Sequence, residues 1–113
     1  MTTEIGVTFD CANPEGMADF WVQALGFVRE GSGDEYAAIV DPEGRRPRIL
    51  FQRVPEPKAV KNRVHLDLHG ADMEAQVEQL LAVGGTRLRT GDDEDGDNWT
   101  VMADPEGNEF CVA

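Results

Sequence analysis

Two stretches of the chain alternate apolar and polar residues, and each is followed by a segment with helical spacing. Val7–Asp10 and Val64–Asp67 alternate with a period of two, as strands do. The segments after them carry apolar residues three and four positions apart and end at Gly26 and at Gly84. The same order of features occurs twice, which predicts an internal duplication of one small unit.

Both helical segments carry signals for where a helix begins. Asn13 is a good N-cap residue with Pro14 at the first helical position, and Asp72 is a candidate cap for the second helix. We assign the apolar stripes to the core and expect each to cover a sheet; their members are Met17, Phe20, Trp21, Ala24 and Leu25, then Met73, Val77, Leu80 and Leu81.

The alternation also predicts which face of each strand is buried. Apolar positions are expected to meet the helices; they are Ile5, Val7, Phe9, Val64, Leu66, Leu68, Phe110 and Val112. The opposite faces are then polar and carry Thr8, Asp10, His65, Asp67, His69, Glu109 and Cys111.

A second repeated motif completes the unit. Asp41–Gly44 and Asp104–Gly107 both read Asp-Pro-Glu-Gly, which fits a type I turn between two strands. The predicted order is strand, helix and three strands, twice over. The proline-flanked stretch Val54–Pro57 links the halves. We expect an α+β fold, with module one at 1–57 and module two at 58–113.

Composition narrows the class of protein. With 41% hydrophobic residues, the 113-residue chain suits one globular domain of two modules. No apolar run is long enough for a membrane helix, and the first residues lack a signal peptide, so we expect a cytoplasmic protein with Cys11 and Cys111 reduced. The net charge of −12 argues against nucleic acid and membrane surfaces as partners. The acidic stretch Asp92–Asp97 is expected to form a solvated loop at one rim of a pocket.

At this point the chain resembles glyoxalase-like members of the vicinal oxygen chelate superfamily, which includes glyoxalase I, extradiol dioxygenases and bleomycin-resistance proteins. The resemblance rests on the doubled order of elements, on Asp19–Trp21 with Leu25 and Gly26, on Val64–Asp67, and on Asp104–Phe110. It implies mixed sheets that curve around a cup-shaped cavity, with the helices on the convex face. Relatives often form homodimers, and we expect one here.

The resemblance also points to a divalent-metal site in the cup. His65 falls at one histidine ligand position of the family. The other three positions differ, so the family ligand set is incomplete; they hold Thr8 or Gly6, Leu50 or Gln52, and Cys111, with Glu109 two residues earlier on the same face.

Strand geometry restricts the metal sites that these residues can form. His65 and His69 would lie roughly 13 Å apart along a strand, too far to share one ion. His65 with Cys111 from a neighbouring strand would offer imidazole and thiolate, a pair that suits zinc. The alternative is a hydrogen-bonded cavity histidine.

Two further residues have both a chemical and a structural interpretation. Glu109 is a candidate general base if its surroundings raise its pKa; the alternative is an ion pair with an arginine such as Arg48 or Arg63. Cys111 is a candidate nucleophile with His65 as its base. The matching positions of Asp10 and Asp67 instead favour caps for loop backbone before each helix.

Three functions follow. The leading hypothesis is a protein that binds, and can transform, a small organic molecule in the cup without the complete metal site of the family. Its ligand would contact Trp99 and Tyr36 as walls and polar groups at His65, Gln52, Thr8, Cys111 and Glu109. A metal-dependent lyase, isomerase or dioxygenase with His65 as a ligand is the second hypothesis. A non-catalytic dimerisation or interaction module is the third.

Overall fold

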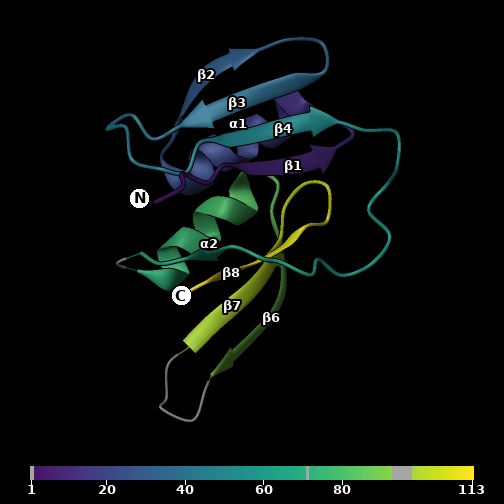
Figure 1. The fold of residues 1–113 in the computed structure, drawn as a ribbon. Helices are drawn as coiled ribbons and strands as arrows, with labels where there is room; N and C mark the ends of the chain where they lie inside the picture. Colours follow the sequence, from purple (N-terminus) through teal and green to yellow (C-terminus); the bar gives the residue numbers. More distant parts are fainter. Residues whose placement is uncertain (1, 71, 93–97) are drawn as a thin grey trace. The chain divides into compact units, whose positions relative to one another are not determined.

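The computed structural model describes residues 2–70, 72–92 and 98–113, and it divides into two compact units, residues 1–57 and 58–113. Each unit contains one helix and a four-stranded sheet in its described part, so the predicted order of strand, helix and three strands is confirmed (Figure 1). Residues 93–97 of the acidic stretch lie outside the described residues. The loop expected there, the curvature of the sheets and a cup shared by both modules stay predictions.

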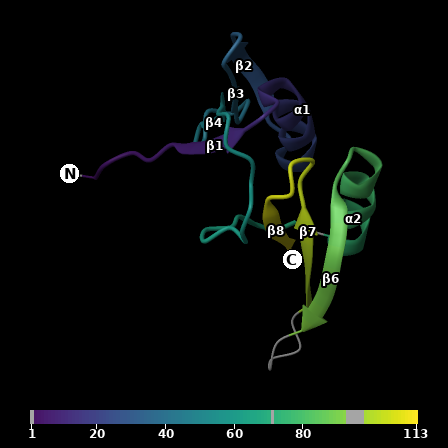
Figure 2. The same cartoon turned by 90° about the vertical axis from the view of Figure 1, so that its right-hand side faces the viewer.

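The first unit is a mixed sheet with α1 against one face (Figures 1 and 2). The sheet order is β1-β4-β3-β2; β1 is parallel to β4, and the other neighbours are antiparallel. The elements of the unit, β1, α1, β2, β3 and β4, span Val7–Cys11, Pro14–Leu25, Val28–Ser32, Tyr36–Val40 and Ile49–Arg53.

Helix α1 begins and ends where its sequence indicates. The side chain of Asn13 accepts a hydrogen bond from the Gly16 amide at 3.1 Å, which satisfies an amide of the first turn. Gly26 ends the helix with φ +70°, a left-handed conformation that costs glycine little. Four residues of the predicted apolar stripe are buried, Met17, Phe20, Trp21 and Ala24, whereas Leu25 is half-buried. The ring of Trp21 lies 5.3 Å from that of Phe9 on β1. The helix therefore covers the apolar face of the sheet.

The second unit repeats this arrangement with the order β5-β8-β7-β6, and β5 is parallel to β8. Its elements, β5, α2, β6, β7 and β8, span Asp67–Leu68, Met73–Ala82, Thr86–Asp92, Asn98–Ala103 and Glu109–Val112. The side chain of Asp72 accepts from the Ala75 amide and caps α2, as expected. Val77 and Leu80 of α2 are fully buried. Among the described residues, no helix combines the length and hydrophobicity that a membrane crossing requires.

The first strand of each unit is shorter than the alternation predicts. Ile5 and Val64 were expected on the buried faces, but they are 70% and 82% exposed and precede β1 and β5. Each of these strands lies at an edge of its sheet and has one strand neighbour. Pairing of β1 begins at Val7 with Ile49, the first residue of β4, and pairing of β5 begins at Asp67 with Cys111, two residues inside β8. Ile5 and Val64 precede the paired residues and remain in solvent.

Both Asp-Pro-Glu-Gly motifs form turns between strands, as predicted. The Gly44 amide donates to the Asp41 carbonyl at 2.9 Å, and the Gly107 amide donates to the Asp104 carbonyl at 2.9 Å. Both glycines have positive φ, +80° and +87°, where a side chain would be strained. The second turn leads directly into β8, and it thereby fixes where the side chains of that strand lie.

Candidate functional site

The first sheet presents a polar face opposite α1. Phe9 and Phe51 are directed to the helix side, and their rings lie 5.3 Å apart. Strand alternation directs their neighbours to the other face. Gln52 pairs with Tyr36 across that face, and Thr8 lies on it one row away. The three ligand-binding residues expected in module one therefore share one face of one sheet.

A cavity of about 280 Å³ opens at the start of β1. Two arginines line it, and both are paired: Arg48 Nε lies 2.5 Å from Glu30 Oε1, and Arg46 Nη2 lies 3.7 Å from Glu4 Oε2. Thr8 contributes a hydroxyl to the wall. The cavity is close in size to small-molecule pockets of proteins. It adds Arg46 and Arg48 to the candidate ligand contacts, although the alternation of the predicted strands gave no signal for either residue.

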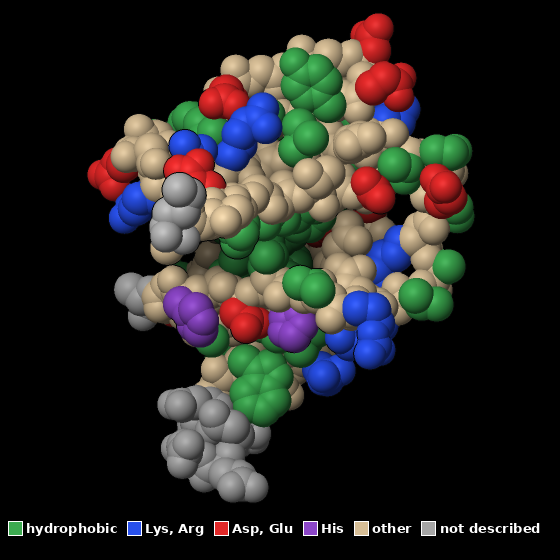
Figure 3. Space-filling view, viewed as in Figure 1, with side chains coloured by type: hydrophobic (Ala, Val, Ile, Leu, Met, Phe, Trp, Pro, Cys, Tyr) green, Lys and Arg blue, Asp and Glu red, His purple; other side chains and the backbone are tan. Residues whose placement is uncertain are grey.

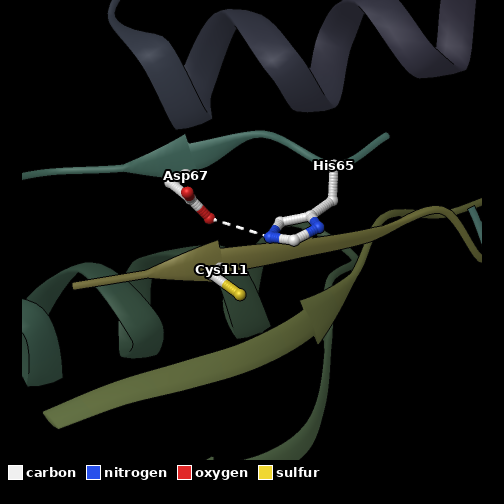
Figure 4. A group of neighbouring side chains, drawn as sticks. All are labelled: His65, Asp67 and Cys111. Atoms are coloured by element: carbon white, nitrogen blue, oxygen red, sulfur yellow. Dashed lines mark ion pairs between the residues drawn. The ribbon is translucent and has the colours of Figure 1, made fainter. Parts of the chain in front are cut away.

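The second sheet brings together three side chains with metal-ligating atoms. His65, Asp67 and Cys111 each offer one such atom, and these atoms all lie within 4.8 Å of one another. Nε2 of His65 lies 3.1 Å from Oδ1 of Asp67. Figure 4 shows the histidine and the carboxylate extending from one chain segment toward Cys111 on β8. Within the described part of the chain this is the one group of three such residues.

His65 and Cys111 were expected to approach each other, whereas Asp67 was expected to have a different role. Asp67 and Cys111 are register partners on the parallel strands β5 and β8, so their side chains lie next to each other on the same face. The pattern carried a signal for this position, because His65 and Asp67 are two residues apart in an alternating segment. What it lacked was the register of β5 against β8.

The registers also correct the internal repeat. Thr8 pairs with Leu50 on β4, and Asp67 pairs with Cys111 on β8. Leu50 and Cys111 are equivalent, because their antiparallel partners, Ala38 and Val101, each lie three residues before an Asp-Pro-Glu-Gly turn. Thr8 and Asp67 therefore hold equivalent positions. Gly6 therefore corresponds to His65, which decides between the two candidates, Thr8 and Gly6. The expected equivalence of Asp10 and Asp67 is wrong, because Asp10 lies opposite Gln52, two residues beyond the position in module one that corresponds to Cys111. Their expected role as caps for loop backbone stays a prediction.

The thiol of Cys111 lies in surroundings that favour its protonated form. Burial raises the pKa of this thiol, and the carboxylate of Asp67 raises it further through its charge and a hydrogen bond. Arg89 and Lys61 act in the opposite direction with smaller effects. A cysteine nucleophile requires a thiolate, so the raised pKa is unfavourable for Cys111 in that role.

Glu109 lies at the start of β8 and contacts the segment that enters the second unit. Its Oε1 accepts a hydrogen bond from the Asn62 amide at 3.0 Å and lies 3.2 Å from Nζ of Lys58. The partner is therefore Lys58, and the expected Arg48 or Arg63 is wrong. The amide lowers the pKa of Glu109 most and the lysine adds to this, whereas partial desolvation opposes them. A general base at neutral pH needs the opposite shift.

The aromatic walls expected from the sequence occupy similar local settings. A Cβ atom at Gly91 would lie 2.9 Å from Cζ2 of Trp99, its partner across β6 and β7. A Cβ atom at Gly33 would lie 2.9 Å from Cε1 of Tyr36. Each ring thus lies over a glycine that leaves room for it. By alternation, Trp99 also shares its face with Val101, the partner of Cys111.

Both histidines of the chain, purple in Figure 3, lie on the same visible surface of the second unit. His65 belongs to the group of three with Asp67 and Cys111, whereas His69 does not. The expectation that one ion does not bridge the two histidines stays a prediction, and His69 supplies a natural control for experiments on His65.

The three ligand atoms fit a divalent-metal site with an open position. In a tetrahedral zinc site, ligand atoms lie roughly 3.5 Å apart, and the ligand atoms of His65, Asp67 and Cys111 lie within 4.8 Å of one another, which is close to that spacing. An imidazole, a carboxylate and a thiolate are all ligands of zinc. Three protein ligands leave the fourth position for water or an organic ligand.

Comparisons with known proteins agree with the fold. Residues 6–113 match the family model described as a glyoxalase-like domain. This chain belongs to the glyoxalase-like domain family. Its α+β fold of two strand-helix-three-strand modules is that of the glyoxalase/bleomycin resistance/dioxygenase superfamily, to which several similar structures belong. No curated protein sequence matches the chain at a significant level.

Solved structures resemble this glyoxalase-like protein at low sequence identity. A glyoxalase/bleomycin resistance/dioxygenase family enzyme from Burkholderia phytofirmans has a TM-score of 0.77 and 18% identity, with 94% of this chain and 93% of that one covered. A glyoxalase-related enzyme from Fulvimarina pelagi has the same TM-score and identity, with 99% and 88% covered. A FosX variant from Listeria monocytogenes, complexed with Mn(II) and 1S,2S-dihydroxypropylphosphonic acid, has a TM-score of 0.80 and 11% identity, with 99% and 90% covered.

Proposed function

We propose that this glyoxalase-like protein binds a small organic molecule at the polar face of its second sheet, together with a divalent metal ion held by His65, Asp67 and Cys111. The observation that carries the proposal is the set of three ligand atoms within 4.8 Å of one another. Zinc is the best match for a donor set that includes a thiolate. The likeness to FosX, described with Mn(II) and a phosphonic acid, supports a metal and a small oxygen-rich ligand on this fold.

A metal ion bound there would polarise an oxygen atom of the organic ligand. The protein's own contribution is to hold its donors in place. Asp67 lies against Nε2 of His65, which orients the imidazole beside β8. The Cys111 thiol gives up its proton when it binds a metal, so metal affinity is expected to rise with pH.

Trp99 adds an apolar surface to the proposed ligand site of the second unit. Trp99 offers a flat apolar surface on the face that carries Cys111. In the first unit, considered by itself, Tyr36, Gln52 and Thr8 share one sheet face and form a candidate ligand surface of that unit, with an aromatic ring, an amide and a hydroxyl.

A metal-free binding protein is the second candidate, and two observations favour it. The raised pKa of Cys111 keeps the thiol protonated at neutral pH in the absence of a metal. Gly6, which has no side chain, takes the position in module one that corresponds to His65. A neutral thiol, an imidazole and a carboxylate would then hydrogen-bond the ligand directly.

Metal content and calorimetric titration distinguish the two candidates. We would measure bound metal by mass spectrometry and titrate zinc, nickel, manganese and iron(II) into wild type, His65→Ala and His69→Ala. Stoichiometric binding that is lost in His65→Ala but kept in His69→Ala supports the metal site. No binding to wild type rejects it, and a thermal-shift screen of organic ligands in the presence of a chelator then tests the metal-free candidate.

We further propose that the chain forms a homodimer. Strand β2 lies at the edge of its sheet and all five of its residues are exposed, and exposed strand edges are common pairing sites. Sedimentation velocity over a concentration series tests this, and a purely monomeric chain at high concentration would contradict it.

A further inference from the structure

The position of His65 needs an explanation beyond strand pairing. Strand β5 consists of Asp67 and Leu68, so His65 precedes it and lies outside the regular ladder. One backbone hydrogen bond is close by, from the Cys111 amide to the Leu66 carbonyl at 2.9 Å. This bond fixes the chain after His65 and leaves the preceding residues to be held by other contacts.

Glu109 makes those contacts. Its Oε1 accepts the Asn62 amide at 3.0 Å, and its two carboxylate oxygens lie 3.2 Å and 3.3 Å from Nζ of Lys58. Nζ of Lys58 also donates to the Val60 carbonyl at 2.6 Å. One carboxylate on β8 thus ties two points of the segment 58–62 to the sheet.

The contacts of Glu109 are partly shielded from solvent, so they help to hold the segment 58–62 in place. The side chains of Lys58 and Glu109 are 23% and 18% exposed, so solvent screens this ion pair less than a fully exposed one. The bond from Asn62 is charge-assisted, and such bonds are stronger than neutral ones. The exposed Val60 and Val64, at 75% and 82%, contribute little packing that would hold the segment.

We propose that Glu109 is a positioning residue for the ligand site, because it holds the segment before His65 so that the imidazole reaches Asp67 and Cys111. The inference rests on the proposed function of that group. Asn62 is three residues from His65, which limits their separation to roughly 10 Å of extended chain. His65 is therefore held from both sides, by the Glu109 contacts before it and by the Leu66 carbonyl after it.

The test compares Glu109→Ala, Glu109→Gln and the control Glu43→Ala. Glu43 lies in the Asp-Pro-Glu-Gly turn of the first module and pairs with the exposed Arg45. The control therefore removes an acidic side chain and an ion pair at a position far in sequence from the segment 58–62. Without metal, we would record hydrogen exchange of the Asn62 amide and the imidazole nitrogen resonances of His65 by NMR. With zinc, we would measure the dissociation constant by calorimetry.

Glu109→Ala is expected to speed exchange of the Asn62 amide at least ~10-fold and to shift the His65 resonances, because the ring loses its fixed approach to Asp67. Zinc affinity should fall ~10–100-fold, the usual effect of removing a group that orients a ligand. Glu109→Gln keeps an acceptor for Asn62, so it should restore part of both effects, and Glu43→Ala should match wild type.

Unchanged Asn62 exchange and unchanged His65 resonances in folded Glu109→Ala would overturn the inference. Equal changes in Glu43→Ala would also overturn it, since they would indicate a general loss of stability. If wild type binds no zinc, the proposed metal site fails, but the metal-free NMR measurements still decide whether Glu109 positions His65.

Discussion

The hairpin that leads into β8 offers a sharp test of how the site is supported. Asp104 is 3% exposed, and its carboxylate accepts hydrogen bonds from the Glu106 amide at 2.9 Å and the Asn108 amide at 3.0 Å. The side-chain amide of Asn108 adds contacts at 3.1 Å and 2.9 Å. Asp104→Ala removes the acceptor for three donor groups while leaving the backbone of the turn intact.

The loss of stability expected for Asp104→Ala follows from these contacts. A hydrogen bond to a charged group contributes about 1.5–3 kcal/mol, but truncation also removes the cost of burying a carboxylate, and the half-buried Asn108 regains some water. We therefore expect Asp104→Ala to lower the free energy of unfolding by about 2–3 kcal/mol. For a chain of this size that corresponds to a fall in Tm of roughly 8–12 °C.

Urea unfolding monitored by circular dichroism measures this change, with Asp41→Ala as the matched variant in the first module. Asp41 accepts from the Glu43 amide and from Arg45, whose side chain is 73% exposed, so its loss should cost clearly less. A loss below about 0.5 kcal/mol for Asp104→Ala, the size of an ordinary surface substitution, would refute the reasoning. So would equal losses for the two variants.

Three further predictions test individual contacts. Asp67→Asn should lower the pKa of Cys111 and speed its alkylation by iodoacetamide at neutral pH, since the charge of Asp67 raises that pKa; an unchanged rate at Cys111, resolved by peptide mass spectrometry, would contradict this. The pKa of Asp41 is lowered, chiefly by the Glu43 amide, so wild type should be more stable than Asp41→Asn above pH ~4 and lose that advantage as pH falls through the lowered value. Urea midpoints across pH check this sign, and an advantage that grows in acid would be inconsistent with it. Gly91→Ala should lower the free energy of unfolding by about 1–3 kcal/mol and change the fluorescence of Trp99, because the added Cβ would collide with that ring. In the control Gly31→Ala the added Cβ meets nothing within 4 Å, so the fluorescence should stay unchanged. Equal effects of the two substitutions would contradict the idea that the Trp99 ring packs on Gly91.

Much of the fold could be predicted because its signals are local. Asn13 and Asp72 cap their helices because a side-chain oxygen reaches an amide three residues ahead. Gly44 and Gly107 end turns whose hydrogen bonds span four residues. The helical stripe and the strand alternation then separate buried from polar faces. The prediction failed at Ile5 and Val64, because the residue at which strand pairing begins is fixed by contacts with a distant strand, with Ile49 for β1 and with Cys111 for β5.

The candidate site was less predictable because its contacts join distant parts of the chain. His65 and Cys111 were expected together from the family resemblance, and the polar face of the strand was evident from alternation. Asp67 was expected on the same polar face but was given a capping role, because the sequence contains no information that directly fixes the register of β5 against β8. A shift of one residue in that register would turn Asp67 to the other face.

The sequence by itself therefore determined the elements, their order in two modules and the family, since each depends on spacings within a few residues. Tertiary structure alone decided that Asp67 lies beside Cys111 and that Glu109 contacts Lys58 and Asn62. These pairs are separated by more than forty residues, and burial and charge at such contacts depend on sheet register. Burial of the Cys111 thiol, and next the contact with Asp67, raise the pKa of Cys111, and both arise from the tertiary structure.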